Sequence, residues 1–241
     1  RKRPCFCLSG WMGERKDSYL AVKGGSPRTP HAHMDAGSFI YEKNGVRWAI
    51  DLGMQNYFSL ESKGVDLWNQ SQEGQRWEVF RLNNMAHNTL TINGNRHLVN
   101  SHATFEQTFE TNERKGVKID MTSVFADCIK KTTRTVYLNK EDELVVEDEL
   151  VTGGEQAMVT WIMVTPADAR IISKNQIELT EAGQRMLLTV TSLKDVEMKI
   201  WSNTPSHDYD ESNPESIRVG FETRLPADRK SLFKTTLVPI G

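Results

Sequence analysis

The chain has 241 residues, of which 38% are hydrophobic and 26% are charged, and its formal net charge is −2. This composition is ordinary for a folded globular protein and argues against disorder. The small negative charge gives no general attraction to nucleic acid or to an anionic membrane, and no stretch approaches the roughly 18 consecutive apolar residues of a transmembrane helix, so neither partner is expected.

The first 30 residues are predicted to hold two strands and a loop. The strands are expected at residues 4–9 and 18–22, and the glycine- and proline-rich residues 24–30 form a loop that leads to His31. Because the chain begins at Arg1 without methionine, we expect it to be a piece of a longer protein. Its three cysteines do not make a disulfide framework.

Residues 38–51 are predicted to form a β-hairpin. Asn44-Gly45 separates two segments of β-forming residues, and this dipeptide is typical of a two-residue type I′ turn, which fixes the register of the strands. The residues expected to face each other are Lys43 and Val46, Glu42 and Arg47, Tyr41 and Trp48, and Ser38 and Asp51. The hairpin therefore predicts that Asp51 lies beside the segment that follows His33.

The segment after the hairpin is predicted to contain a long loop and three strands. Residues 58–75 are polar with scattered glycines and are expected to form the loop. Residues 77–82 show the alternation of a strand, and residues 87–92 are expected to form a strand that ends at the turn Asn93-Gly94. A short strand at residues 97–99 is expected to follow this turn.

The remaining sequence shows strand patterns at near-regular spacing and no long helical pattern. Strands are expected at residues 104–111, 117–125, 132–138, 144–151, 157–164, 177–179, 185–190, 196–200, 216–221 and 232–238. This pattern predicts an all-β fold, a large antiparallel β-sandwich of several layers with little helix, as one domain over residues 1–241. The acidic residues 147–149 are expected on a solvated strand face near a sheet edge.

Three side chains can form a metal site if the segments that carry them converge: His33, Asp51 and His87. Neutral imidazole and carboxylate are ligands that zinc prefers. In an extended segment the rings of His31 and His33 point to the same side, so the pattern leaves open whether one or both bind metal. Asp35 and Asn88 are candidates to hold the imidazole rings through hydrogen bonds.

A dense set of motifs lies between residues 24 and 92. They are Gly24-Gly25-Ser26, the segment from His31 to Phe39, Asn44-Gly45-Val46-Arg47-Trp48, Asp51-Leu52-Gly53, Tyr57, Arg76-Trp77, Arg81 and His87-Asn88-Thr89-Leu90. Together they resemble the heparinase II/III-like family of polysaccharide lyases. The resemblance implies an N-terminal α/α toroid and C-terminal antiparallel β-sandwich layers with the active site between them, and this chain resembles only the second part.

The resemblance also implies the roles of individual residues. It makes His33, Asp51 and His87 the ligands of a metal, usually zinc, although another divalent metal fits the same donors. It makes His31 a catalytic or substrate-contacting residue. Tyr57, Arg76 and Arg81 become candidates for contact with the substrate, since a guanidinium group binds a carboxylate or sulfate through two parallel hydrogen bonds.

The activity implied by the resemblance is cleavage of uronic-acid polysaccharides, of the glycosaminoglycan, heparan-like or alginate-like kind, by β-elimination. Such a reaction needs the uronate carboxylate neutralised, the proton at C5 removed and the leaving oxygen protonated, and a histidine such as His31 suits proton transfer near neutral pH. The implied location is periplasmic or secreted. Because the toroid carries further catalytic residues, we expect the isolated chain to have little or no lyase activity.

One other function is compatible with the pattern, and two further classes of enzyme fit it poorly. A carbohydrate-binding or structural β-sandwich would use the metal only to hold a loop, with Tyr57, Trp68 and Trp77 as a sugar platform. A cupin-like metalloenzyme also uses His-X-His, but it expects a glutamate a few residues later, where this chain has Asp35 and Glu42. A glycoside hydrolase needs two facing carboxylates, and no such pair is evident.

Overall fold

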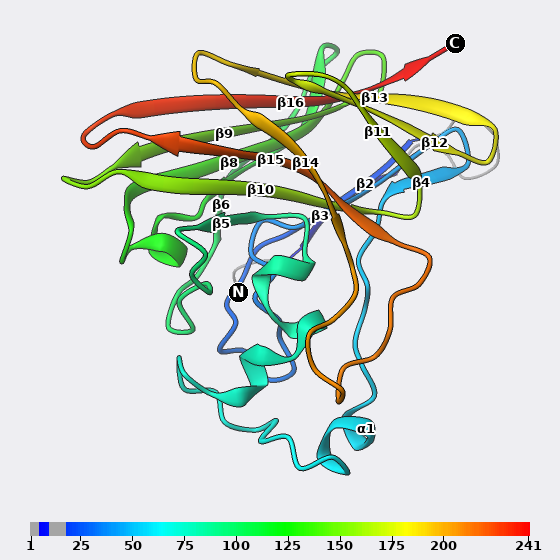
Figure 1. The fold of residues 1–241 in the computed structure, drawn as a ribbon. Helices are drawn as coiled ribbons and strands as arrows, with labels where there is room; N and C mark the ends of the chain where they lie inside the picture. Colours follow the sequence, from blue (N-terminus) through cyan, green and yellow to red (C-terminus); the bar gives the residue numbers. More distant parts are fainter. Residues whose placement is uncertain (1–4, 10–17) are drawn as a thin grey trace.

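A computed structural model describes residues 5–9 and 18–241 of the chain, and in it the strands form three antiparallel sheets (Figure 1). The first sheet contains, in spatial order, β1 (Cys5–Ser9), β2 (Ser18–Lys23), β3 (Phe39–Lys43) and β4 (Val46–Ala49). The second contains β14 (Glu197–Ser202), β15 (Ile217–Leu225), β10 (Ala157–Thr165) and β5 (Leu90–Ile92).

The third sheet has eight strands and is the largest layer. Its spatial order is β11 (Asp168–Ser173), β12 (Gln176–Glu181), β13 (Gln184–Ser192), β16 (Lys230–Ile240), β9 (Leu144–Thr152), β8 (Ile129–Asn139), β7 (Arg114–Asp120) and β6 (Thr104–Glu110). The prediction of a layered antiparallel sandwich with little helix is confirmed.

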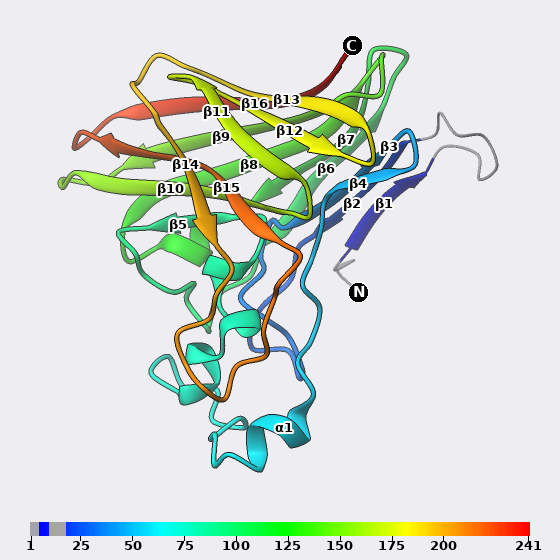
Figure 2. The same ribbon diagram turned by 45° about the vertical axis from the view of Figure 1, so that its right-hand side comes forward.

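The helical segments are short, and all but the last lie together at one end of the sheets. They are α1 (Tyr57–Glu61) and the 3-10 helices η1 (Gln75–Glu78), η2 (Phe80–Leu82), η3 (Asn84–Ala86) and η4 (Thr122–Phe125). Figures 1 and 2 show α1, the η1–η3 segment and the loop between β14 and β15 below the strands in both views. No helix in the described part of the chain is long and apolar enough to span a membrane.

One hydrophobic core joins the three sheets through a row of aromatic side chains. The ring centroids of Phe39 on β3 and Trp161 on β10 are 6.1 Å apart, and those of Trp161 and Phe221 on β15 are 6.0 Å apart. Phe221 in turn lies 5.4 Å from Phe233 on β16. All four side chains are buried. Aromatic contacts of this kind add about 0.5–1.5 kcal/mol each beyond the area they bury.

The hairpin of β3 and β4 has the predicted turn, and the two residue pairs nearest the turn have the predicted register. Asn44 and Gly45 have φ angles of 56° and 78°, the two positive values that a type I′ turn requires. The expected pairs of Lys43 with Val46 and of Glu42 with Arg47 are confirmed.

Beyond these two pairs the predicted hairpin register is wrong. Tyr41 faces Ala49 rather than Trp48, because a bulge shifts the register between Tyr41 and Glu42. The bulge allows the consecutive Trp48 and Ala49 both to be buried. Strand β4 then ends at Ala49, so Asp51 does not pair with a residue of β3.

The predicted strand at residues 77–82 is also wrong, since this segment forms η1 and η2. Its backbone bonds are local: Trp77 N–H donates to Gly74 O at 3.1 Å, and Leu82 N–H donates to Val79 O at 3.0 Å. Both sets of alternating side chains are buried to a large extent. A buried segment without a partner strand satisfies its backbone groups by short turns.

Several other predicted elements differ in their bounds from the observed ones. Residues 58–75 contain most of α1, whose N-terminus is capped by Asn56, and are not one loop. Only Leu90–Ile92 of the predicted strand 87–92 is a strand, and residues 97–99 are not. Strand β7 ends at Asp120 and η4 follows, while β11 was not predicted.

The acidic residues 147–149 do not lie near a sheet edge, because β9 is enclosed between β16 and β8. Asp148 is buried and accepts two hydrogen bonds from Arg134 on β8, at 2.7 Å from Nε and 3.0 Å from Nη2. The prediction of a solvated face is therefore wrong for Asp148. Glu147 and Glu149 lie on the other face of the strand and pair with lysines of β16.

Candidate active site and metal centre

The segments before β3, after β4 and before β5 meet at a pocket of about 510 Å³. The titratable residues that line it are Lys23, His31, His33, Asp35 and Asp51. His87 lies behind the pocket, fully buried, and contacts His33 and Asp51. The segments that the sequence singled out therefore converge, although the register that was expected to bring Asp51 there does not hold.

His31 is exposed and has a φ of 62°, in the left-handed region that few residues other than glycine adopt. The segment from His31 to His33 is consequently not extended, and the two rings take different neighbours. The Nδ1 atom of His31 lies 3.3 Å from the Tyr57 hydroxyl, and the two rings are stacked with centroids 5.6 Å apart. A strained backbone at a pocket is typical of functional sites.

Trp68 completes an aromatic cluster with His31 and Tyr57. It is 57% exposed, and its ring stands edge-on to both, at centroid distances of 5.8 Å from His31 and 5.6 Å from Tyr57. Its Nε1–H donates to Glu61 Oε1 at 2.7 Å, which fixes the indole on the surface. The cluster offers flat apolar faces beside His31, the kind of surface on which sugar rings pack.

Arg76 lies beneath this cluster and is buried, so its guanidinium is not presented to solvent. Its Nη2 donates to the carbonyl of Ala32 at 2.9 Å and its Nη1 to Leu67 O at 3.2 Å. The guanidinium also lies 5.9 Å from the Tyr57 ring centroid. Arg76 thus supports the backbone between His31 and His33 and the ring that contacts His31.

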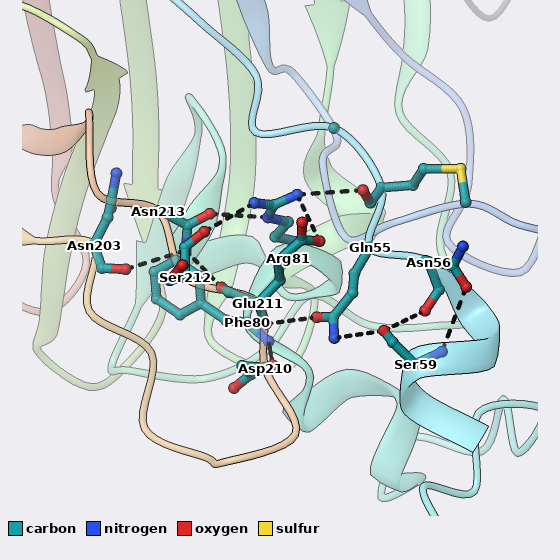
Figure 3. A network of polar contacts seen from close by, with 12 residues as sticks. Gln55, Asn56, Ser59, Phe80, Arg81, Asn203, Asp210, Glu211, Ser212 and Asn213 are labelled. Carbon is teal, nitrogen blue, oxygen red and sulfur yellow. Dashed lines mark hydrogen bonds and ion pairs between the residues drawn. The ribbon is translucent and has the colours of Figure 1, made fainter. Parts of the chain in front are cut away.

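The side chain of Arg81 likewise makes its polar contacts within the protein (Figure 3). It donates to Asn213 Oδ1 at 2.9 Å, Ser212 O at 3.2 Å and Met54 O at 3.3 Å, and it forms an ion pair with Glu211 at 3.2 Å. These contacts tie the loop between β14 and β15 to the segment that carries Tyr57. The geometry favours a supporting role for Arg81 over direct contact with a substrate.

Gln55 is a second bridge in the network of Figure 3 that the sequence did not reveal. Its buried side chain donates to Tyr209 O at 2.7 Å and to Ser59 Oγ at 3.2 Å, and accepts from Glu211 N–H at 3.0 Å. All its polar atoms are satisfied, so it holds the start of α1 against the loop. No sequence pattern marks a glutamine for such a role.

His33 and His87 form the centre of the candidate metal site. Their ring centroids are 5.3 Å apart, and one ligand atom each of His33, Asp35 and His87 lies within 4.8 Å of the other two. The Nε2 atom of His87 is buried and has no hydrogen-bond partner in the described part of the chain. A buried, unpaired imidazole nitrogen is costly unless a ligand binds it, so the site fits a metal ion.

Asp51 contacts His87 from the opposite side of the ring. The Nδ1–H of His87 donates to Asp51 Oδ2 at 3.0 Å, and Asp51 Oδ1 accepts from Gly53 N–H at 2.7 Å. This contact places the proton on Nδ1 and leaves Nε2 as the lone-pair donor, as in metal sites where a carboxylate orients a histidine. Asp51 is thus placed to orient His87, and Asp35, grouped with the two histidines, is a second candidate for the carboxylate ligand.

The electrostatics of the cluster follow from burial and from these contacts. Burial and the neighbouring His87 lower the pKa of His33 to about 4, so His33 is neutral near pH 7 and can bind a metal. Burial alone would lower the pKa of His87, but the charge and hydrogen bond of Asp51 outweigh it and raise that pKa. Burial likewise opposes the Asp51 carboxylate, yet the contact with His87 lowers the pKa of Asp51.

Asn88 supports the site from within the core and does not touch the histidines. Its side chain donates to Phe39 O at 2.6 Å and Ile50 O at 2.9 Å, and accepts from Val164 N–H at 2.6 Å. It therefore joins β3, the residue before Asp51, and β10. The prediction that Asn88 holds an imidazole ring is wrong, because its three polar contacts are all with backbone atoms.

The whole chain resembles one protein family and several solved structures. Residues 4–233 match the family model for heparinase II/III-like, C-terminal. No curated protein sequence matches the chain. A crystal structure of heparinase III aligns with 99% of the chain at a TM-score of 0.76 and 15% identity, and the aligned part is 36% of that protein.

Two further solved structures share the fold. One is another heparinase III, with a TM-score of 0.74, 16% identity, and coverage of 99% of this chain and 35% of its own. The other is the heparan sulfate lyase HepC from Pedobacter heparinus, with a TM-score of 0.74, 14% identity, and coverage of 98% and 35%. The chain thus spans about a third of the length of the solved structures it matches.

Proposed function

We propose a function for this chain on the basis of its family, since it belongs to the heparinase II/III-like C-terminal family. In this proposal it is the metal-binding β-sandwich part of a lyase that cleaves uronic-acid-containing polysaccharides by β-elimination. The family makes the chain the C-terminal domain of a heparinase-like polysaccharide lyase. The rest of the proposed enzyme is an N-terminal α/α toroid that forms the other wall of the active-site cleft. We propose a periplasmic or secreted location on the same premise.

The observation that carries this proposal is the pocket, because His31 lies exposed in it beside the half-buried His33 and Asp51 and the buried Asp35. In β-elimination at a uronate, the proton on C5 leaves, the bond from C4 to the leaving oxygen breaks, and a C4–C5 double bond forms. We assign to His31 the transfer of a proton or the neutralisation of the uronate carboxylate. Tyr57 orients its ring, and Arg76 holds the carbonyl of Ala32 that follows it.

We propose further that His33, His87 and one carboxylate hold a divalent metal, with zinc as the expected ion. The unpaired Nε2 of His87 and the neutral form of His33 support this assignment. A metal bound there would supply positive charge that fixes the His31–Asp35 loop in place. It would not need to activate a water molecule, since β-elimination uses no water-derived nucleophile. Within the chain, Asp51 keeps His87 in the tautomer that leaves Nε2 free.

The full-length protein that contains this chain is expected to release unsaturated uronide from a heparan-like, other glycosaminoglycan or alginate-like polysaccharide. The C4–C5 double bond conjugated to the carboxylate is detected by its ultraviolet absorbance, and hydrolysis does not generate this signal. The isolated chain should show little or no activity, because the toroid residues are missing. Robust activity of residues 1–241 alone would contradict this division of the active site.

Metal analysis of the purified full-length protein is expected to find about one zinc ion for this site, as a single three-ligand site requires. His33→Ala and His87→Ala should lose it, while His102→Ala, which removes an exposed histidine outside the pocket, should keep it. A metal-free and well-folded wild type would overturn the assignment.

The two candidate carboxylates differ in their expected effect on metal affinity. Replacing a residue that only orients a ligand typically costs about 10- to 100-fold in affinity, whereas removing a ligand costs more. Comparing Asp35→Asn with Asp51→Asn by metal titration therefore identifies which one binds the ion. The family resemblance favours Asp51, and the close grouping with His33 and His87 favours Asp35.

A further inference from the structure

Lys23 has a place in the pocket that neither the metal cluster nor His31 explains. It is the last residue of β2, its side chain is 44% exposed, and it is the only lysine or arginine among the described residues that line the pocket. Its Nζ forms an ion pair with the nearly buried Asp35. An ammonium group has three donors, so this contact leaves two of them for a ligand.

Two hydrogen bonds hold the backbone of Lys23 against the segment that follows the metal cluster. Lys23 N–H donates to Ser38 O at 2.8 Å, and Gly37 N–H donates to Lys23 O at 2.8 Å. Gly37 and Ser38 lie two and three residues after Asp35. The lysine therefore stands at the end of a strand that is hydrogen-bonded to the segment next to Asp35.

We propose that Lys23 binds an anionic group of the polysaccharide, a carboxylate or a sulfate, in the pocket beside His31. This inference rests on the proposed lyase function. The chain has a formal charge of −2, and two carboxylates, Asp35 and Asp51, line the pocket, so an acidic polymer is repelled unless a local cation binds it. Lys23 offsets the charge of Asp35 and presents its remaining donors to the anion.

The charge-removing variant Lys23→Met in the full-length lyase tests the assignment. Loss of a hydrogen bond to a charged group predicts a fall in kcat/KM of about 10- to 100-fold, mainly through a higher KM. Lys23→Arg should recover most of the activity. The matched control is Lys130→Met, which removes an exposed ion pair with Asp228 outside the pocket and should leave kcat/KM unchanged.

Measurements on sulfated and desulfated polysaccharide distinguish the two anions. An equal loss in Lys23→Met on both substrates assigns the carboxylate, whereas a loss only on the sulfated one assigns the sulfate. In either case kcat/KM of the variant should depend less steeply on salt than that of the wild type, because one ionic contact is gone.

Two results would overturn the assignment of Lys23 while the lyase function stands. One is equal kcat/KM for wild type and Lys23→Met. The other is loss of bound metal in Lys23→Met, which would mean that Lys23 acts only by supporting Asp35. A wild type that cleaves no uronic-acid polysaccharide is a separate result, and it contradicts the proposed function itself.

Discussion

His31→Ala in the full-length protein is expected to lower kcat for cleavage of a uronic-acid polysaccharide by about 10²- to 10⁴-fold, the usual contribution of a positioned acid–base group. The imidazole is exposed in the pocket and is oriented by the Tyr57 hydroxyl. Its removal takes away the proposed proton-transfer or charge-neutralising group and buries no new polar atom. The measurement is the rate of formation of unsaturated product.

Because His31 has a positive φ, alanine at this position also strains the backbone. His31→Asn separates the two effects, since asparagine tolerates the left-handed region and still lacks the imidazole. Both variants should retain bound metal, His31→Asn should keep the wild-type melting temperature, and the control His102→Ala should cleave normally. Unchanged cleavage by His31→Asn would rule out a catalytic His31 and favour a non-catalytic, carbohydrate-binding or structural β-sandwich.

Arg134→Met is expected to destabilise the 241-residue chain by about 3–5 kcal/mol, the cost of removing one partner of a buried ion pair. Arg134 and Asp148 are both buried and form two hydrogen bonds. Arg134 Nη1 also donates to Gly37 O at 3.0 Å and to Asn88 O at 2.9 Å. The variant therefore leaves a buried carboxylate and two carbonyl groups without their donor.

Urea unfolding measures this loss as a lower midpoint at an unchanged slope. The double variant Arg134→Met with Asp148→Leu should regain part of the stability, since no charge is then left unpaired. Lys130→Met is the exposed counterpart and should cost under about 1 kcal/mol, as its ion pair with Asp228 is solvated. A loss below about 1 kcal/mol in Arg134→Met would contradict the role of this pair.

Arg134 contributes both to the stability of the fold and to the structure of the candidate metal site. Gly37 follows Asp35, and Asn88 follows His87, so one guanidinium holds the two segments that carry the metal cluster. Gly37 has a φ of 75°, and a Cβ there would lie 2.6 Å from Met121 Sδ, so both the backbone conformation and the space favour glycine at this position. We expect Arg134→Met to weaken metal binding as well as folding.

The alternation of side chains along the two strands predicts this pair. Arg134 and Asp148 occupy the same alternate positions as the apolar Val136 and Val146 on their two strands, which predicts that both charged side chains point inward. Two inward charges of opposite sign on consecutive strands are best explained as partners. As a run of three acids, residues 147–149 indicate a solvated face, but their alternate positions put Asp148 on the buried side and Glu147 and Glu149 on the other.

The turn at Asn44-Gly45 and the all-β class were decided by the sequence alone, because both depend on local backbone preference and on periodicity. The candidate residues His31, His33, Asp51 and His87 could also be identified there. What only the tertiary structure decided is how they meet. A bulge at Trp48, the 3-10 turns at residues 75–82 and the charged core at Arg134 arise from packing between segments that are distant in the chain. The bulge and the 3-10 turns leave no local signal in the sequence. For the same reason Lys23 enters the site only once the sheets are assembled, and Asp35 joins His33 and His87 as a candidate ligand only there.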